Sequence, residues 1–204
     1  MEETFISHQP YWGSMGKPKP PPGQRFVEEW QIYSALGVPK IDLASWTLTM
    51  GGLTERILVL SYEELSSMPQ TKILDDFHCV TGWSLRSLEF EGVSMRHLAE
   101  LAGVRPEAKW VMFVCADGYT APVPIEDALH EKSLVVLKMN GKPLTVEQGF
   151  PARPFIPHLY AWKSAKWLVS IEFMKSYVDG YWEARGYHER GNVYLEERYK
   201  SKST

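Results

Sequence analysis

At residues 75–84 the chain reads DDFHCVTGWS, with Cys79 at its centre. Residues 73–83 form an apolar, strand-like approach to a Thr-Gly turn, so we expect a strand that delivers Cys79 to the turn beyond it. The other cysteine, Cys115, lies in a separate apolar run. Two cysteines do not make a disulfide framework, although a single Cys79–Cys115 bridge stays open at this stage.

Cys79 has three interpretations from the residues alone. It can be a small buried hydrophobe, which is the commonest use of an isolated cysteine. It can be a nucleophile whose base is one of the chain's histidines: His78, His97 or His158. It can also be a soft metal ligand. The sequence has no CxxC or HExxH spacing, so a metal held by Cys79 would need its other donors from an organic cofactor.

The composition limits the class of protein. The 204 residues are 44% hydrophobic and 23% charged, with a net charge of -3, which indicates a globular chain rather than a binder of nucleic acid. Residues 1–23 contain no apolar signal core and no twin-arginine pair, and no apolar run is long enough for a membrane span. We therefore expect a cytoplasmic protein with no membrane span.

The chain divides into a proline-rich arm at residues 1–23 and one domain at residues 24–204. The 14 prolines and 15 glycines favour short elements over a helical bundle. We expect a strand pair within residues 41–60, a helix capped by Ser61 and Glu64, and a helix at residues 93–104 capped by Ser94. Apolar runs predict further strands at residues 110–115, 134–139 and 166–173, with a short helix at residues 124–129. The pattern is typical of an α+β fold.

Residues 148–162 carry three prolines between aromatic side chains, so we expect an irregular but buried segment of functional importance. Arg153, Lys163, Ser164 and Lys166 lie in or just after it, and Lys163 to Lys166 are expected to open the following strand. Such cations and a hydroxyl can hold a phosphate, or they can be solvated surface charge. Asp117 and Tyr119 can line a pocket at a strand end or simply form a turn.

Many short motifs occur together in a fixed order. They are HCVTGWS (78–84), EGV (91–93), DGYT (117–120), GKPL (141–144), GFPAR (149–153), PHLYAWKSAKW (157–167), GYWE (180–183) and RGYH (185–188). This set resembles the molybdopterin-binding oxidoreductases of the sulfite oxidase family, and is most similar to their small, stand-alone members. The resemblance covers roughly residues 24–199.

The resemblance implies mixed β-sheets with short peripheral helices around a buried pterin. It implies a molybdenum-molybdopterin cofactor, with Cys79 as the protein ligand of the metal and Asp117 and Tyr119 as further catalytic residues. The short chain leaves little room for an added nucleotide and favours the monophosphate form of the pterin. Arg153 and the run Ser164, Ala165 and Lys166 would hold the pterin phosphate. The full set of cofactor-binding residues implied is Tyr33, Ser34, Ala35, His78, Thr81, Gln148, Arg153, Lys163, Ser164, Ala165 and Lys166.

The implied reaction is two-electron oxygen-atom transfer on a small sulfur- or nitrogen-centred substrate, with an electron-transfer protein as a second partner. Tyr33 stands where sulfite oxidases carry a substrate-binding arginine, and Gly82 where many small relatives carry a basic residue. The resemblance therefore does not extend to sulfite as the substrate. Two other classes stay open, namely a cofactor-binding subunit without turnover of its own and a cysteine-nucleophile enzyme.

Overall fold

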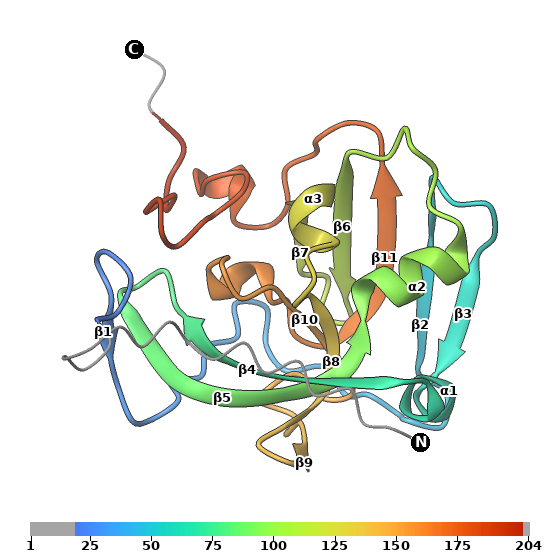
Figure 1. Cartoon of the computed structure of the whole chain (residues 1–204), viewed down its shortest axis with the longest axis horizontal. Helices are drawn as coiled ribbons and strands as arrows, with labels where there is room; N and C mark the ends of the chain where they lie inside the picture. Colours follow the sequence, from blue (N-terminus) through green and yellow to red (C-terminus); the bar gives the residue numbers. More distant parts are fainter. Residues whose placement is uncertain (1–18, 202–204) are drawn as a thin grey trace.

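The computed structural model describes residues 19–201, so most of the predicted arm at residues 1–23 lies outside the described residues. Two mixed β-sheets with short helices make up this part of the chain, which confirms the expected α+β class (Figure 1). The longest helix has only 8 residues. None of the helices between residues 19 and 201 has the length and apolar character that crossing a membrane requires.

The first sheet is built around β5 (Trp83–Ser94), which pairs with β4 (Gln70–His78) and β8 (Leu134–Met139) in antiparallel fashion. β1 (Arg25–Phe26) pairs with the start of β5 in parallel. The short strands β9 (Lys142–Pro143) and β10 (Arg153–Phe155) both pair with β8. The Cys79 turn therefore lies at the end of the hairpin that β4 and β5 form.

The second sheet has the order β3-β2-β11-β6-β7. Its strands are β2 (Thr47–Gly52), β3 (Leu58–Ser61), β6 (Trp110–Cys115), β7 (Thr120–Pro124) and β11 (Leu168–Met174). Only the β11–β2 pair is parallel. Leu48, Met50, Ile171 and Phe173 are buried at alternate positions along the two central strands, so one face of this sheet packs into the main core.

The helices are α1 (Tyr62–Ser67), α2 (Met95–Ala102) and α3 (Ile125–Ala128). The predicted capping box at α1 is confirmed, since Glu64 N donates to Ser61 Oγ at 3.2 Å and Ser61 N donates to Glu64 Oε2 at 2.7 Å. Gly103 ends α2 with a φ of 67°. Ser94 occupies the cap position of α2, but its side chain makes no capping hydrogen bond, so that part of the prediction was wrong.

Three sequence predictions need correction. Residues 83–94 form one long strand, so the helix predicted from residue 93 begins only at Met95, because β5 gains backbone partners on both sides from β4 and β8. The proline-rich segment contains the short strand β10. Lys163 ends the 3-10 helix η1 (Ala161–Lys163), and β11 begins only at Leu168.

A buried carboxylate on α3 attaches the carboxyl-terminal segment to the body. Asp127, with a side chain only 4% exposed, accepts hydrogen bonds from His158 Nε2 at 2.7 Å and from Arg190 Nε and Nη2 at 2.7 and 2.8 Å. Burial alone would raise the pKa of Asp127, but the hydrogen bonds and charges of His158 and Arg190 outweigh it and lower the pKa to about 2.

This pKa predicts an acid-sensitive contribution to stability. A carboxyl whose folded pKa is depressed stabilises the fold above its unfolded pKa, and that contribution is lost as the pH falls from about 4 to about 2. The difference corresponds to about 2 kcal/mol. Chemical denaturation at a series of pH values should show this loss, and Asp127→Asn should flatten it. Asp179→Asn, which removes an exposed ion pair with Lys200, is the matched control and should change stability by less than about 1 kcal/mol. Parallel stability curves for wild type and Asp127→Asn would contradict the assignment.

Candidate functional site

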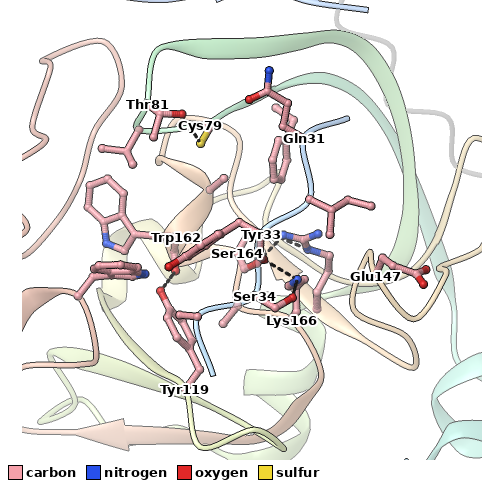
Figure 2. A pocket seen from close by; sticks show the side chains of 18 of the residues that line it. Gln31, Tyr33, Ser34, Cys79, Thr81, Tyr119, Glu147, Trp162, Ser164 and Lys166 are labelled. Atoms are coloured by element: carbon pink, nitrogen blue, oxygen red, sulfur yellow. Dashed lines mark hydrogen bonds between the residues drawn. The ribbon is translucent and has the colours of Figure 1, made fainter. Parts of the chain in front are cut away.

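A cavity of about 500 Å³ opens beside the Cys79 turn. It is bounded by five stretches of chain, at residues 30–35, 77–83, 117–119, 147–167 and 182–187. Most of the site residues predicted from the sequence line it, namely Tyr33, Ser34, Ala35, Cys79, Thr81, Asp117, Tyr119, Arg153, Ser164, Ala165 and Lys166. Figure 2 shows Cys79 and Thr81 on one side of the cavity and Ser164 and Lys166 on the other, with Tyr33 between them.

The Cys79 turn is closed by its own backbone. Cys79 N donates to Trp83 O at 2.8 Å, and Gly82 N donates to Cys79 O at 3.1 Å. Gly82 has a φ of 94°, which glycine adopts at little cost, and a Cβ there would lie 3.2 Å from Gly23 O. Cys79 Sγ lies 3.2 Å from Thr81 Oγ1. Both cysteines are free thiols, so the Cys79–Cys115 bridge does not form.

Arg153 places a buried charge at the opposite side. The residue is only 4% exposed. Its Nε donates to Ser164 Oγ at 3.0 Å, its Nη2 to Ser164 O at 2.6 Å and its Nη1 to Gln148 O at 2.8 Å. All of these acceptors are neutral oxygens. Burial lowers the pKa of Arg153 to about 10, which leaves the guanidinium charged at neutral pH.

Lys166 adds a second cation beside Arg153. Its Nζ donates to Tyr33 O and to Ser34 Oγ, both at 2.7 Å. Burial and the Arg153 charge lower the pKa of Lys166 to about 8. Within residues 19–201 no carboxylate forms an ion pair with Arg153 or Lys166. A buried charge without a partner is costly, so this end of the cavity fits an anionic group such as a phosphate.

Aromatic side chains form the walls between the two ends. The lining includes Trp30, Phe77, Trp83, Trp162, Trp167, Trp182 and Tyr187. The Trp182 and Tyr187 rings lie 4.9 Å apart, and the Tyr33 and Trp182 rings 6.4 Å apart. None of these residues was predicted from the sequence to belong to the site, and neither were Gln31, Ile32 and Glu147. The high tryptophan content was the available signal, and the walls fit a flat ring system.

Lys163 was predicted to hold the cofactor but lies outside the cavity lining. It is 1% exposed, and its Nζ donates to Glu183 Oε1 at 2.7 Å and to Pro122 O at 2.6 Å. Glu183 Oε1 also accepts from Trp162 Nε1 at 2.8 Å. Lys163 therefore acts on the site through Glu183, which fixes the Trp162 wall.

His78 and Gln148 also lie outside the cavity lining. His78 is 2% exposed, its Nδ1 lies 2.8 Å from Ser84 Oγ, and burial lowers its pKa. Gln148 Oε1 accepts from Thr145 N at 2.9 Å, so its side chain closes a local turn. Gln148 contributes to the site only through its backbone carbonyl, which accepts from Arg153.

Asp117 and Tyr119 line the cavity from the turn after β6. Tyr119 OH donates to Trp162 O at 2.6 Å, and burial raises the pKa of Tyr119 well above its usual value. The hydroxyl can donate to a substrate only if that bond breaks. Asp117 Oδ1 accepts from Tyr119 N at 3.0 Å, and burial raises the pKa of Asp117.

Together, a thiol, two cations without an ion-pair partner and aromatic walls fit a planar, anionic cofactor that carries a metal. The family model described as the oxidoreductase molybdopterin binding domain matches residues 35–182. The chain belongs to this family, the sulfite oxidase family of oxidoreductases, and its cofactor is molybdenum-molybdopterin.

Individual relatives agree with this assignment. The chain is 41% identical to the "uncharacterized oxidoreductase YuiH" of Bacillus subtilis, over 88% of this chain and 91% of that protein. It is 32% identical to the "putative protein-methionine-sulfoxide reductase subunit YedZ1" of Azospira oryzae, over 74% of this chain and 57% of that one. It is 29% identical to the "protein-methionine-sulfoxide reductase catalytic subunit MsrP" of Campylobacter jejuni, over 72% and 55%. The chain thus spans little more than half of these two relatives.

A solved structure shows the same fold. The chain matches the crystal structure of the sulfane dehydrogenase SoxCD from Paracoccus pantotrophus with a TM-score of 0.63 and 24% identity. The match covers 69% of this chain and 41% of that one. It supports the expected fold of mixed sheets with short helices.

The two lysines near the site should respond differently to substitution. Lys163→Met leaves the Glu183 carboxylate buried without its ion-pair partner, which should destabilise the cofactor-free protein by about 3–5 kcal/mol. Lys166→Met removes a half-buried cation with no carboxylate partner and should change stability by less than about 1 kcal/mol. Denaturant unfolding of the two variants measures both values. Equal destabilisation would show that the two lysines do not differ in role.

Proposed function

We propose that this protein catalyses two-electron oxygen-atom transfer on a small sulfur- or nitrogen-centred substrate, with Cys79 as the protein ligand of molybdenum. One observation carries the proposal. A single aromatic-walled cavity has the Cys79 thiol on one side and two cations without an ion-pair partner on the other, namely the buried Arg153, which is hydrogen-bonded to Ser164, and the half-buried Lys166.

The residues of this chain would bind and orient the cofactor. Arg153, Ser164 and Lys166 would hold its phosphate, and the guanidinium fork already points at neutral oxygens that leave its charge available. Lys166 would in turn position Tyr33 and Ser34, which accept hydrogen bonds from its Nζ. When bound, molybdenum-molybdopterin supplies the two-electron redox chemistry, while the protein supplies binding, orientation and exclusion of water.

A neutral sulfur-centred substrate, such as a sulfoxide, is the first candidate. Arg153 and Lys166 are the only cationic side chains in the described lining of the cavity, and the proposed cofactor phosphate uses both. No further cation then remains there for an anion such as sulfite. Relatives named as methionine-sulfoxide reductases support the same substrate class, and the relative named as a subunit supports an electron-transfer protein as a partner.

Replacing the thiol tests the proposed ligand. Cys79→Ser should keep its pterin content within about twofold of the wild type, because the phosphate end of the site is intact. The rate of dye-linked sulfoxide reduction should nevertheless fall at least 100-fold, which exceeds the roughly 10–100-fold loss typical of changes around a metal ligand. Both quantities are measured on protein from a molybdenum-replete host. Undiminished turnover by Cys79→Ser would contradict the assignment. Wild-type protein that carries the cofactor but never turns over would favour a cofactor-binding subunit.

Replacing the buried guanidinium tests the phosphate end. Arg153→Met removes charge-assisted hydrogen bonds to the proposed phosphate, each worth about 1.5–3 kcal/mol, so cofactor content should fall at least about tenfold. Pterin and molybdenum per protein chain are the measured quantities. Arg105→Met, which changes an exposed arginine outside the cavity, is the control and should retain the wild-type content. Wild-type content in Arg153→Met would place the anion elsewhere.

A further inference from the structure

A buried hydrogen-bond network ends at the Cys79 carbonyl, and its side chains, from Gln24, Ser84 and His78, do not line the cavity. Gln24 Nε2 donates to Cys79 O at 3.1 Å. Ser84 Oγ donates to Gln24 Oε1 at 2.9 Å, and His78 Nδ1 lies 2.8 Å from Ser84 Oγ. Gln24 is 9% exposed, Ser84 0% and His78 2%. This hydrogen-bond network connects the residues before and after the turn to the carbonyl of Cys79.

The hydrogen bond to Cys79 O fixes the direction of the other hydrogen bonds in this network. A backbone carbonyl can only accept, so Gln24 must present its NH₂ group to Cys79 and its oxygen to Ser84. The Ser84 hydroxyl has one proton, which it donates to Gln24, so it must accept from His78. The His78 ring is therefore protonated at Nδ1.

His78 Nε2 is buried and has no hydrogen-bond partner in the described part of the chain. Leaving a buried polar atom unpaired costs free energy, and an apolar side chain would fill the same space without that cost. The other nitrogen of the ring provides the reason for a histidine here, because it donates to Ser84 and so orients Gln24 toward the Cys79 carbonyl.

Two distant parts of the sequence hold the same turn. In the amino-terminal part, Arg25 N donates to Gly82 O at 2.9 Å, next to Gln24 itself. From the carboxyl-terminal part, Arg198 Nη2 donates to Gly23 O at 3.0 Å and its Nη1 donates to Val80 O. The Cys79 turn is thus held by groups that do not line the cavity.

We propose that Gln24, Ser84 and His78 are positioning residues that fix the peptide plane of Cys79 and so direct its Sγ into the cavity. Cys79 O accepts two hydrogen bonds, one from Gly82 N within the turn and one from Gln24 outside it. Among the hydrogen bonds of residues 19–201, only the one from Gln24 ties the Cys79 carbonyl to another segment. Groups that orient a metal ligand strongly affect metal binding and reactivity. The inference rests on the proposed function, in which Cys79 is the molybdenum ligand.

Gln24→Glu tests the proposal with little change in shape. The carboxylate still accepts from Ser84 but places a negative oxygen against Cys79 O, which loses its outer donor. In cofactor-free protein, alkylation of Cys79 by iodoacetamide should accelerate several-fold as the turn loosens. Cys115 is 3% exposed and should stay unmodified, which reports that the fold is intact. Arg25→Ala, which changes an exposed side chain beside Gln24, should keep the wild-type rate.

The loaded protein gives an independent readout. Gln24→Glu should shift the electron paramagnetic resonance spectrum of the half-reduced metal and lower kcat about 10–100-fold with KM unchanged. Ser84→Ala should act in the same direction, and Ser84→Thr, which restores the hydroxyl, should recover the wild-type spectrum. Ser84→Ala also serves if Gln24→Glu does not fold.

The two readouts separate the possible failures. Wild-type alkylation rates and spectra in both Gln24→Glu and Ser84→Ala would overturn the positioning role. Protein that contains no molybdenum would refute the proposed function, while the alkylation rates would still decide whether Gln24 holds the Cys79 turn.

Discussion

The buried charge of Arg153 is the constraint on which the site depends. The guanidinium is almost fully removed from water, and every described acceptor around it is a neutral oxygen. Those acceptors belong to Gln148, which lies in a turn, and to Ser164, which directly follows the 3-10 helix η1, so none of them is used in a regular ladder. A buried charge with only neutral acceptors destabilises a protein that has no ligand, but it suits a protein that binds a phosphate-bearing cofactor.

The other parts of the site place the Cys79 thiol on the side of the cavity opposite the Arg153 charge. The hairpin of β4 and β5 brings Cys79 to the cavity, while the second sheet contributes Asp117 and Tyr119 after β6 and Trp167 before β11. Buried groups that do not line the cavity stiffen its walls, as Lys163 and Glu183 do for Trp162. The hydrogen-bond network of His78, Ser84 and Gln24 serves the same purpose for the Cys79 turn.

Local signals in the sequence predicted much of this. The α1 capping box and most strands followed from spacing and turn chemistry, and the ordered motifs indicated the family and many of the residues that line the cavity. The helix predicted from residue 93 begins only at Met95, because Val93 and Ser94 pair with Val135 and Leu134 of β8, which are remote in sequence. Lys163 and Lys166 are three residues apart and equally basic, so only tertiary structure could show that Glu183 takes one of them. The position of Gln24 behind Cys79 likewise depends on a contact across 55 residues.

X-ray absorption at the molybdenum edge tests the central claim most directly. Wild-type protein should show a sulfur neighbour of the metal in addition to those of the pterin dithiolene, and Cys79→Ser should lose that one neighbour while retaining the others. An unchanged sulfur shell in Cys79→Ser would contradict the claim that this cavity holds molybdenum through Cys79.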